Sequence, residues 1–165
     1  PLSPDSGACP GPTGAKCRPA CGSSQLCTAA SGGTCAKLYT LAGAASKPKA
    51  MVQIALAYVE CWNKQPKSDT LCATFDTCTM TGSLTHNMVK NWVCNQSQVT
   101  DFPNATVHNL AKQVNGCGLT NITRPDWKIN SIQGGVRGKV CLTYDSISWW
   151  PDKLHVNTCK AFPPK

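Results

Sequence analysis

The chain has 165 residues, a length that suits one domain with a terminal extension. Its 16 Lys and Arg residues against 8 Asp and Glu residues give a net charge of +8, which favours acidic partners such as an anionic membrane surface or acidic polysaccharide. The basic residues are scattered, so we expect no nucleic acid as a partner, and no apolar segment approaches the ~18 residues of a membrane span. The ordinary interpretation of such scattered charge is the solubility of a small secreted domain.

Twelve cysteines are spread along the chain, and their number is even. They stand at Cys9, Cys17, Cys21, Cys27, Cys35, Cys61, Cys72, Cys78, Cys94, Cys117, Cys141 and Cys159. Metal sites would concentrate them in Cys-x-x-Cys pairs, and none occurs, so we expect no metal and no cofactor. The pattern predicts disulfides at every cysteine, with a connectivity that the sequence leaves open.

The opening 35 residues are rich in Gly, Pro, Ser and Ala and contain few large apolar side chains. Such a stretch buries too little surface to fix itself, so disulfides must hold it. We expect residues 21–33, "CGSSQLCTAASGG", to form a bridged loop. We further expect residues 1–20 to be an extension of a main domain over 21–165, and the chain to be a mature form without its signal peptide.

Two segments have the periodicity of helices. Residues 49–62 carry apolar side chains around most of the circumference, which predicts a well-buried helix with Pro48 at its start. Residues 107–114 show one apolar stripe, which predicts a core face. Asn104 or Thr106 is suited to cap the start of this second helix, and residues 115–116, Asn-Gly, are suited to stop it. His108 falls on its polar face, where we expect a solvated side chain.

Strands are predicted late in the chain. Residues 136–147 alternate with period two, as in a half-buried strand, while 127–132 and 153–159 are shorter candidates. Residues 87–96 are ambiguous between strand and helix. The irregular order of helices and strands, without a β-α-β repeat, indicates an α+β fold with an antiparallel sheet.

Three Asn-x-Ser/Thr sequons support a secreted, extracellular glycoprotein, and we expect glycosylation at Asn95, Asn104 and Asn121. Catalytic signals are few: the acidic residues are isolated, His86 and His155 have no motif around them, and no Gly-x-Ser-x-Gly or His-Glu-x-x-His occurs. We therefore expect no enzyme. Trp149 and Trp150 precede Pro151 and are suited either to cover a small core, the commoner role, or to stack on sugar rings.

Over roughly residues 21–145 the chain resembles the fungal killer toxin four family. The resemblance lies in five features that occur in the same order. The first three are a Cys-x-Gly-Ser-Ser-type loop, a helix that begins with Met-Val-x-Ile and ends near a cysteine, and two further cysteines. The last two are a helix that ends with Gly-Cys and a strand with the pattern Gly-x-apolar-x-apolar-x-Tyr. These features fall at 21–33, at Met51, Val52, Ile54 and Cys61, at Cys72 and Cys78, at 110–117, and at Gly138, Val140, Leu142 and Tyr144.

The resemblance implies a disulfide-stapled α/β sandwich, in which two helices pack on an antiparallel sheet. It also implies a pairing of Cys21 with Cys117 that pins the opening segment to the end of the second helix. Members are basic, secreted and non-catalytic, and the founding toxin blocks calcium channels. This chain departs from the family at residues 73–77, "ATFDT", which hold Asp76 in place of the toxin's basic loop. The resemblance therefore does not extend to channel blockade through that loop.

The sequence thus predicts a secreted, monomeric killer-toxin-like protein, antifungal or host-directed as a virulence effector. Its target is a cell-surface protein, with a calcium channel as one candidate. One alternative is an effector or lectin-like module that binds cell-wall glycan, and another is a small secreted hydrolase. The candidate binding residues are Lys47, Lys49, Lys64 and Lys67 around the first helix, together with Trp149 and Trp150.

Overall fold

A computed structural model describes residues 25–27, 35–64, 70–96, 99–118, 123–146 and 152–159. Its α-helices are α1 (Pro48–Lys64), α2 (His86–Asn91) and α3 (Ala105–Val114), with a π-helical turn η1 (Trp92–Gln96) and a 3₁₀ turn η2 (Val99–Asp101) between the last two. The strands are β1 (Gln25–Cys27), β2 (Cys35–Thr40), β3 (Gly43–Ala44), β4 (Thr70–Asp76), β5 (Met80–Thr81), β6 (Ser83–Leu84), β7 (Pro125–Trp127), β8 (Ile132–Gln133), β9 (Arg137–Asp145) and β10 (Lys153–Thr158).

The main sheet has six strands in the order β1-β2-β4-β9-β10-β7. The prediction of an antiparallel sheet holds for the pairs β1–β2, β4–β9 and β9–β10, but it was wrong for β2–β4 and β7–β10, which pair in parallel. The first parallel pair follows from α1, which connects β2 to β4 as a crossover, the connection that parallel strands require. A single crossover gives no repeated β-α-β pattern in the sequence.

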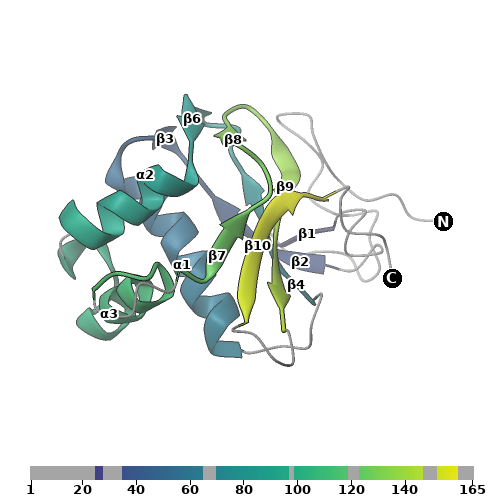
Figure 1. The fold of residues 1–165 in the computed structure, drawn as a ribbon. Helices are drawn as coiled ribbons and strands as arrows, with labels where there is room; N and C mark the ends of the chain where they lie inside the picture. Colours follow the sequence, from purple (N-terminus) through teal and green to yellow (C-terminus); the bar gives the residue numbers. More distant parts are fainter. Residues whose placement is uncertain are drawn as a thin grey trace.

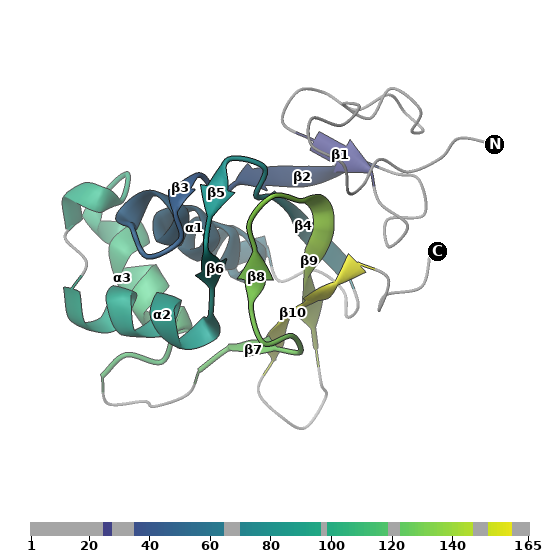
Figure 2. The same ribbon diagram turned by 90° about the horizontal axis from the view of Figure 1, so that it is seen from above.

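Helix α1 carries the core, as its apolar periodicity predicted. Ile54, Ala55 and Tyr58 are fully buried, and the helix lies across one face of the large sheet (Figures 1 and 2). Helix α3 packs on α1, and α2 packs beside β7, so the helices gather on the same side of the sheet (Figure 1). The molecule is therefore a mixed α and β fold with a single large core.

Both ends of α3 form as the sequence predicted. The side chain of Asn104 accepts a hydrogen bond from the backbone N–H of Val107 at 2.9 Å, which caps the start of the helix. At the other end, Gly116 adopts a φ of 76°, a conformation that favours glycine, and the helix stops at Val114. The N–H groups of Gly116 and Cys117 donate to the carbonyls of Gln113 and Lys112, which completes a Schellman motif.

His108 was expected to be solvated, and that expectation was wrong. The residue is only 7% exposed, and its ring stacks on Phe102 with centroids 4.8 Å apart. Phe102 in turn stacks on Trp92. The ambiguous segment 87–96 is helical, as α2 and η1, and this places Trp92 where it completes a stack of three rings. The helical pattern of α3 alone does not reveal this packing, because Phe102 and Trp92 lie outside that helix.

Strands β9 and β10 form where the sequence predicted them, but β9 is buried on both faces. Cys141 and Thr143, which alternation placed on an exposed face, are 0% and 3% exposed. Leu71 of β4 lies opposite Thr143 and packs against Cys141, so the second face is covered along this stretch. The expected loop 21–33 also contains a strand, because β1 pairs with β2 in an antiparallel hairpin.

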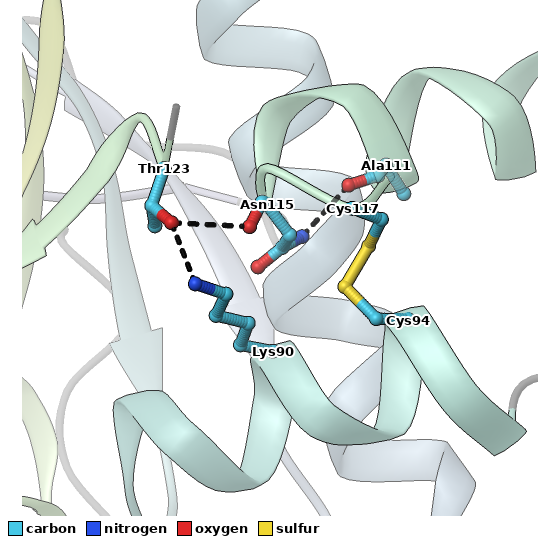
Figure 3. Close-up of a disulfide and its surroundings, with 6 residues drawn as sticks. All are labelled: Lys90, Cys94, Ala111, Asn115, Cys117 and Thr123. Atoms are coloured by element: carbon cyan, nitrogen blue, oxygen red, sulfur yellow. Dashed lines mark hydrogen bonds between the residues drawn. A yellow bond between two sulfur atoms is a disulfide. The ribbon is translucent and has the colours of Figure 1, made fainter. Parts of the chain in front are cut away.

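The cysteine pattern predicted disulfides without their connectivity, and the described bridges span 11 to 23 positions of sequence. Cys61 at the end of α1 bonds to Cys72 of β4, and Cys141 of β9 bonds to Cys159 beyond β10. Cys94 of η1 bonds to Cys117 after α3 (Figure 3). The pairing of Cys21 with Cys117, taken from the family resemblance, was therefore wrong.

The remaining described cysteines whose side chains are placed are bridged as well. Cys35 and Cys78 are both disulfide-bonded. Cys9, Cys17 and Cys21 lie outside the described residues, as does the expected extension over residues 1–20. Within the described part of the chain, no helix is both long enough and apolar enough to cross a membrane.

Candidate functional site

The lysines predicted as binding residues stand at two separate places. Lys47 and Lys49 are exposed at the start of α1, and Lys64 is exposed at its end. Because α1 has 17 residues, these two places are about 24 Å apart. Lys67, Trp149 and Trp150 lie outside the described residues. The predicted patch is therefore not continuous over the part of the chain that the structure describes.

A compact basic surface forms instead where the end of α1 meets β2. We call the side chains of Lys37, Tyr39, Glu60 and Lys64 the β2–α1 surface. Glu60 accepts hydrogen bonds from the ammonium of Lys37 and from the buried hydroxyl of Tyr39. The ammonium of Lys37 also lies 5.0 Å from the centre of the Tyr39 ring, within cation–π range.

Electrostatics hold Glu60 in its charged form. Burial alone would raise the pKa of its carboxyl, but the hydrogen bonds from Lys37 and Tyr39 and the charges of Lys37 and Lys64 outweigh burial and lower it. Lys64 stands four residues after Glu60 on α1, the spacing that brings helical side chains together. Two cations thus surround one anion, and the surface keeps a positive excess at neutral pH.

Lys37 is the member of this surface that sequence reasoning missed. The segment "CAKLYT" buries Ala36 and Tyr39, which are three residues apart, so it lacks the strict alternation that identifies a strand. Its partner Glu60 is 23 residues away on another element. A cross-element pair of this kind leaves no local pattern in the sequence.

A second group of cations converges where residue 123 meets the end of α3, and Figure 3 shows one of them, Lys90. Lys90 donates to the hydroxyl of Thr123 at 2.8 Å, and Lys153 donates to its carbonyl at 2.9 Å. The Thr123 hydroxyl donates to the carbonyl of Asn115 at 3.3 Å. The negative end of a helix dipole lies at the C-terminus, where it stabilises nearby cations. This group is therefore explained as a structural junction that docks residue 123 on α3.

Asn115 lies at the centre of this junction. Its side-chain N–H₂ donates to the carbonyl of Ala111 at 2.8 Å, which fixes the orientation of the amide, while its Oδ1 is buried without a partner. In Figure 3 the Oδ1 faces the same space as the Lys90 ammonium, which is a donor. A donor such as an ammonium or a water molecule suits this oxygen, whereas an anion does not.

The described tryptophans have rings that are occupied by packing. Trp127 stacks on His86 at 5.9 Å and donates its indole N–H to the hydroxyl of Tyr58. Trp62 contacts Tyr144 and lies under the guanidinium of Arg124 at 4.9 Å. A sugar-stacking platform needs a free aromatic face. The rings of Trp62 and Trp127 therefore do not support the hypothesis of glycan binding, which depends on Trp149 and Trp150.

The acidic residues are less isolated in space than in sequence. His155 of β10 lies between Asp126 of β7 and Asp145 of β9, with ring nitrogen to carboxylate distances of 3.9 and 3.8 Å. Burial alone would raise the pKa of Asp126, but the hydrogen bond from Lys128 and the charges of Lys128, His155 and Lys153 lower it. Within the described residues, no group of His, Cys, Asp and Glu side chains is arranged to hold a metal ion. These contacts explain the cluster as charge compensation between neighbouring strands.

Two of the predicted glycosylation sites fall within the described residues. Asn95 is exposed in η1, and Asn104 is exposed at the start of α3. Asn121 lies outside the described part of the chain. Comparison of the chain with models of protein families, with curated proteins and with solved structures finds no match. The interpretation of function therefore rests on the residues themselves.

Proposed function

We propose that this chain is a secreted, non-catalytic, killer-toxin-like protein that binds an acidic target on the surface of a competitor or host cell and inhibits its growth. The observation that carries the proposal is the β2–α1 surface, where Lys37 and Lys64 are exposed around a single carboxylate. Exposed positive charge speeds encounter with an acidic partner and fixes its orientation. A calcium channel of the target cell is the specific candidate that the family resemblance suggests.

The fold is compatible with this proposal. Several disulfides in one small domain, such as Cys61–Cys72, Cys94–Cys117 and Cys141–Cys159 among the described residues, are typical of proteins that fold in an oxidising compartment and act outside the cell. Helices on one side of a sheet (Figure 1) are the feature that supports the layered arrangement proposed from the resemblance. The mixed strand directions and the Cys94–Cys117 bridge are departures from it. The contact residues of the founding toxin are therefore not carried over to this chain.

The test compares two double variants that remove the same charge from different surfaces. K37Q/K64Q neutralises the β2–α1 surface, whereas K47Q/K49Q neutralises the exposed lysines at the other end of α1. Each change at Lys47, Lys49 or Lys64 is expected to alter the free energy of unfolding by about 0.5 kcal/mol or less, and loss of the exposed Lys37–Glu60 ion pair by about 1 kcal/mol or less. Binding of each protein to fungal and plant cells, and inhibition of their growth, are measured at low and at high salt.

We expect K37Q/K64Q to lose most of the cell binding and growth inhibition of the parent, and K47Q/K49Q to retain them. Added salt is expected to weaken the binding of the parent protein to cells, because salt screens exposed charges. The difference in cell binding between the parent and K37Q/K64Q should therefore become smaller at high salt. Equal loss in both variants would indicate that net charge alone matters. If both variants bind cells and inhibit growth as well as the parent does, the β2–α1 surface is excluded as the binding surface. Trp149 and Trp150 would then be the next candidate binding residues.

The same assay separates the alternatives. Growth inhibition that added calcium relieves favours the channel target. Retention on chitin or glucan without inhibition favours the glycan-binding module, and turnover of a glycan or ester substrate favours the hydrolase.

A further inference from the structure

One sequon lies wholly within the described residues, at positions 104–106, Asn-Ala-Thr. All three of its residues are exposed. The sequon at Asn95 ends on a residue outside the described part of the chain, and Asn121 lies outside it altogether.

The oxygen and the nitrogen of the Asn104 side chain have different roles in the structure. The oxygen Oδ1 accepts the N–H of Val107 at 2.9 Å and so caps α3, while the Asn104 backbone carbonyl accepts the N–H of His108 at 3.1 Å. The nitrogen Nδ2 donates no hydrogen bond to any described residue, and the side chain stands in an exposed position. The atom that glycosylation modifies is thus the one that the fold does not use.

We propose that Asn104 is N-glycosylated and that it continues to cap α3 with the sugar attached. The donor class is a lipid-linked oligosaccharide diphosphate. A bond forms between Nδ2 and the anomeric carbon of the first sugar, the bond from that carbon to the diphosphate oxygen breaks, the lipid diphosphate leaves, and Nδ2 loses one proton. The carbonyl Oδ1 takes no part, so its hydrogen bond to Val107 remains available.

The position of α3 determines which part of the molecule a glycan at Asn104 would cover. Figures 1 and 2 show α3 at one end of the molecule and the β1–β2 hairpin at the other. An oligosaccharide is bulky and solubilising, and from α3 it would cover the helical end. Lys37 of the β2–α1 surface lies in that hairpin, whereas Glu60 and Lys64 lie on α1, against which α3 packs. The inference rests on the secretory route of the proposed function, but not on target binding.

The experiment uses the full chain, secreted from a eukaryotic host behind a secretion signal. Unreduced and reduced peptides are mapped by mass spectrometry before and after enzymatic removal of N-glycans in isotopically heavy water, which converts each formerly occupied Asn to a labelled Asp. Because the host supplies the secretory route, the readout at residue 104 does not depend on whether the protein inhibits cells.

Two variants separate the sugar from the cap. T106A destroys the sequon and keeps Asn104, and N104D keeps a capping oxygen but has no amide nitrogen to modify. We expect the parent to carry a glycan at Asn104, and both variants to lose that glycan alone while keeping the midpoint of thermal unfolding of the enzymatically deglycosylated parent. A folded, secreted parent with unmodified Asn104 would overturn the proposal, whether or not Asn95 or Asn121 is occupied. So would a glycosylated parent in which hydrogen exchange shows the Val107 amide unprotected, because the cap would then be lost.

Discussion

At the residue scale, the clearest consequence of the fold is the buried state of His108. Burial, together with the nearby charge of Lys112, lowers the pKa of its imidazole, and the charge of Asp101 opposes this only in part. In the unfolded chain the imidazole has its ordinary pKa of about 6.5. The unfolded state therefore binds more protons than the native state between the two values, and the free energy of unfolding falls as the pH drops through this window.

We expect H108F to flatten this pH dependence, because Phe can keep the ring stack on Phe102 and cannot ionise. Denaturant unfolding between about pH 7 and about pH 5 measures the slope, even if the variant has a different stability at neutral pH. His86 contributes in the same direction, since burial and Lys90 also lower its pKa. H86F should therefore flatten the slope as well, and the slope of H86F/H108F should be flatter than that of either single variant. An H108F slope equal to that of the parent would contradict the buried, neutral state of His108.

At the element scale, α3 depends on the left-handed residue that ends it. Gly116 has a φ of 76°, where a residue with a Cβ is strained by about 1–2 kcal/mol. We expect G116A to lower the free energy of unfolding by about that amount, measured by denaturant unfolding. Gly43 is the control, because it has the same φ of 76° and nothing within 4 Å of an added Cβ. A larger loss in G116A than in G43A would show steric or capping effects beyond backbone strain, and no loss in either would contradict the left-handed geometry.

The elements that could be predicted from the sequence are those whose signals are local. Helix α3 was predicted at both ends because Asn104 and Gly116 act on their own neighbours. Strand β4 was not predicted, and its pairing with β9 shifts register between Leu71 and Ala73 and again between Thr74 and Asp76. Such irregularities break the period of two. The parallel direction of β2 and β4 depends on where α1 returns the chain, which no residue pattern encodes.

The same distinction applies to the candidate site. Lys64 was predicted because it flanks an evident helix, and the structure finds it exposed there. Lys37 was missed because its role depends on Glu60, which a crossover brings to the neighbouring strand. The solvation of His108 was predicted wrongly because a helical pattern describes only one helix and omits what packs against it.

At the scale of the whole molecule, disulfides fasten elements both between and within the layers, since Cys61–Cys72 joins α1 to the sheet and Cys94–Cys117 joins two helical segments. Cys94–Cys117 fastens η1 to the end of α3, beside the junction at which Lys90 and Thr123 meet that helix (Figure 3). The bridge spans 23 positions of sequence. By chain entropy, a loop of this size stabilises the folded state by about 3 kcal/mol.

We therefore expect C94S/C117S to lower the free energy of unfolding by about 3 kcal/mol, because the unfolded chain regains the freedom that the bridge removes. Both cysteines are partly exposed, so replacement by Ser adds little penalty for a buried hydroxyl. Denaturant unfolding measures the change, with C94S and C117S as controls. Each single variant also breaks the bridge, so each should lose a similar amount and expose one reactive thiol. Peptide mapping of the unreduced parent should recover Cys94 joined to Cys117, and a peptide joining Cys117 to another cysteine, such as Cys21, would contradict this arrangement.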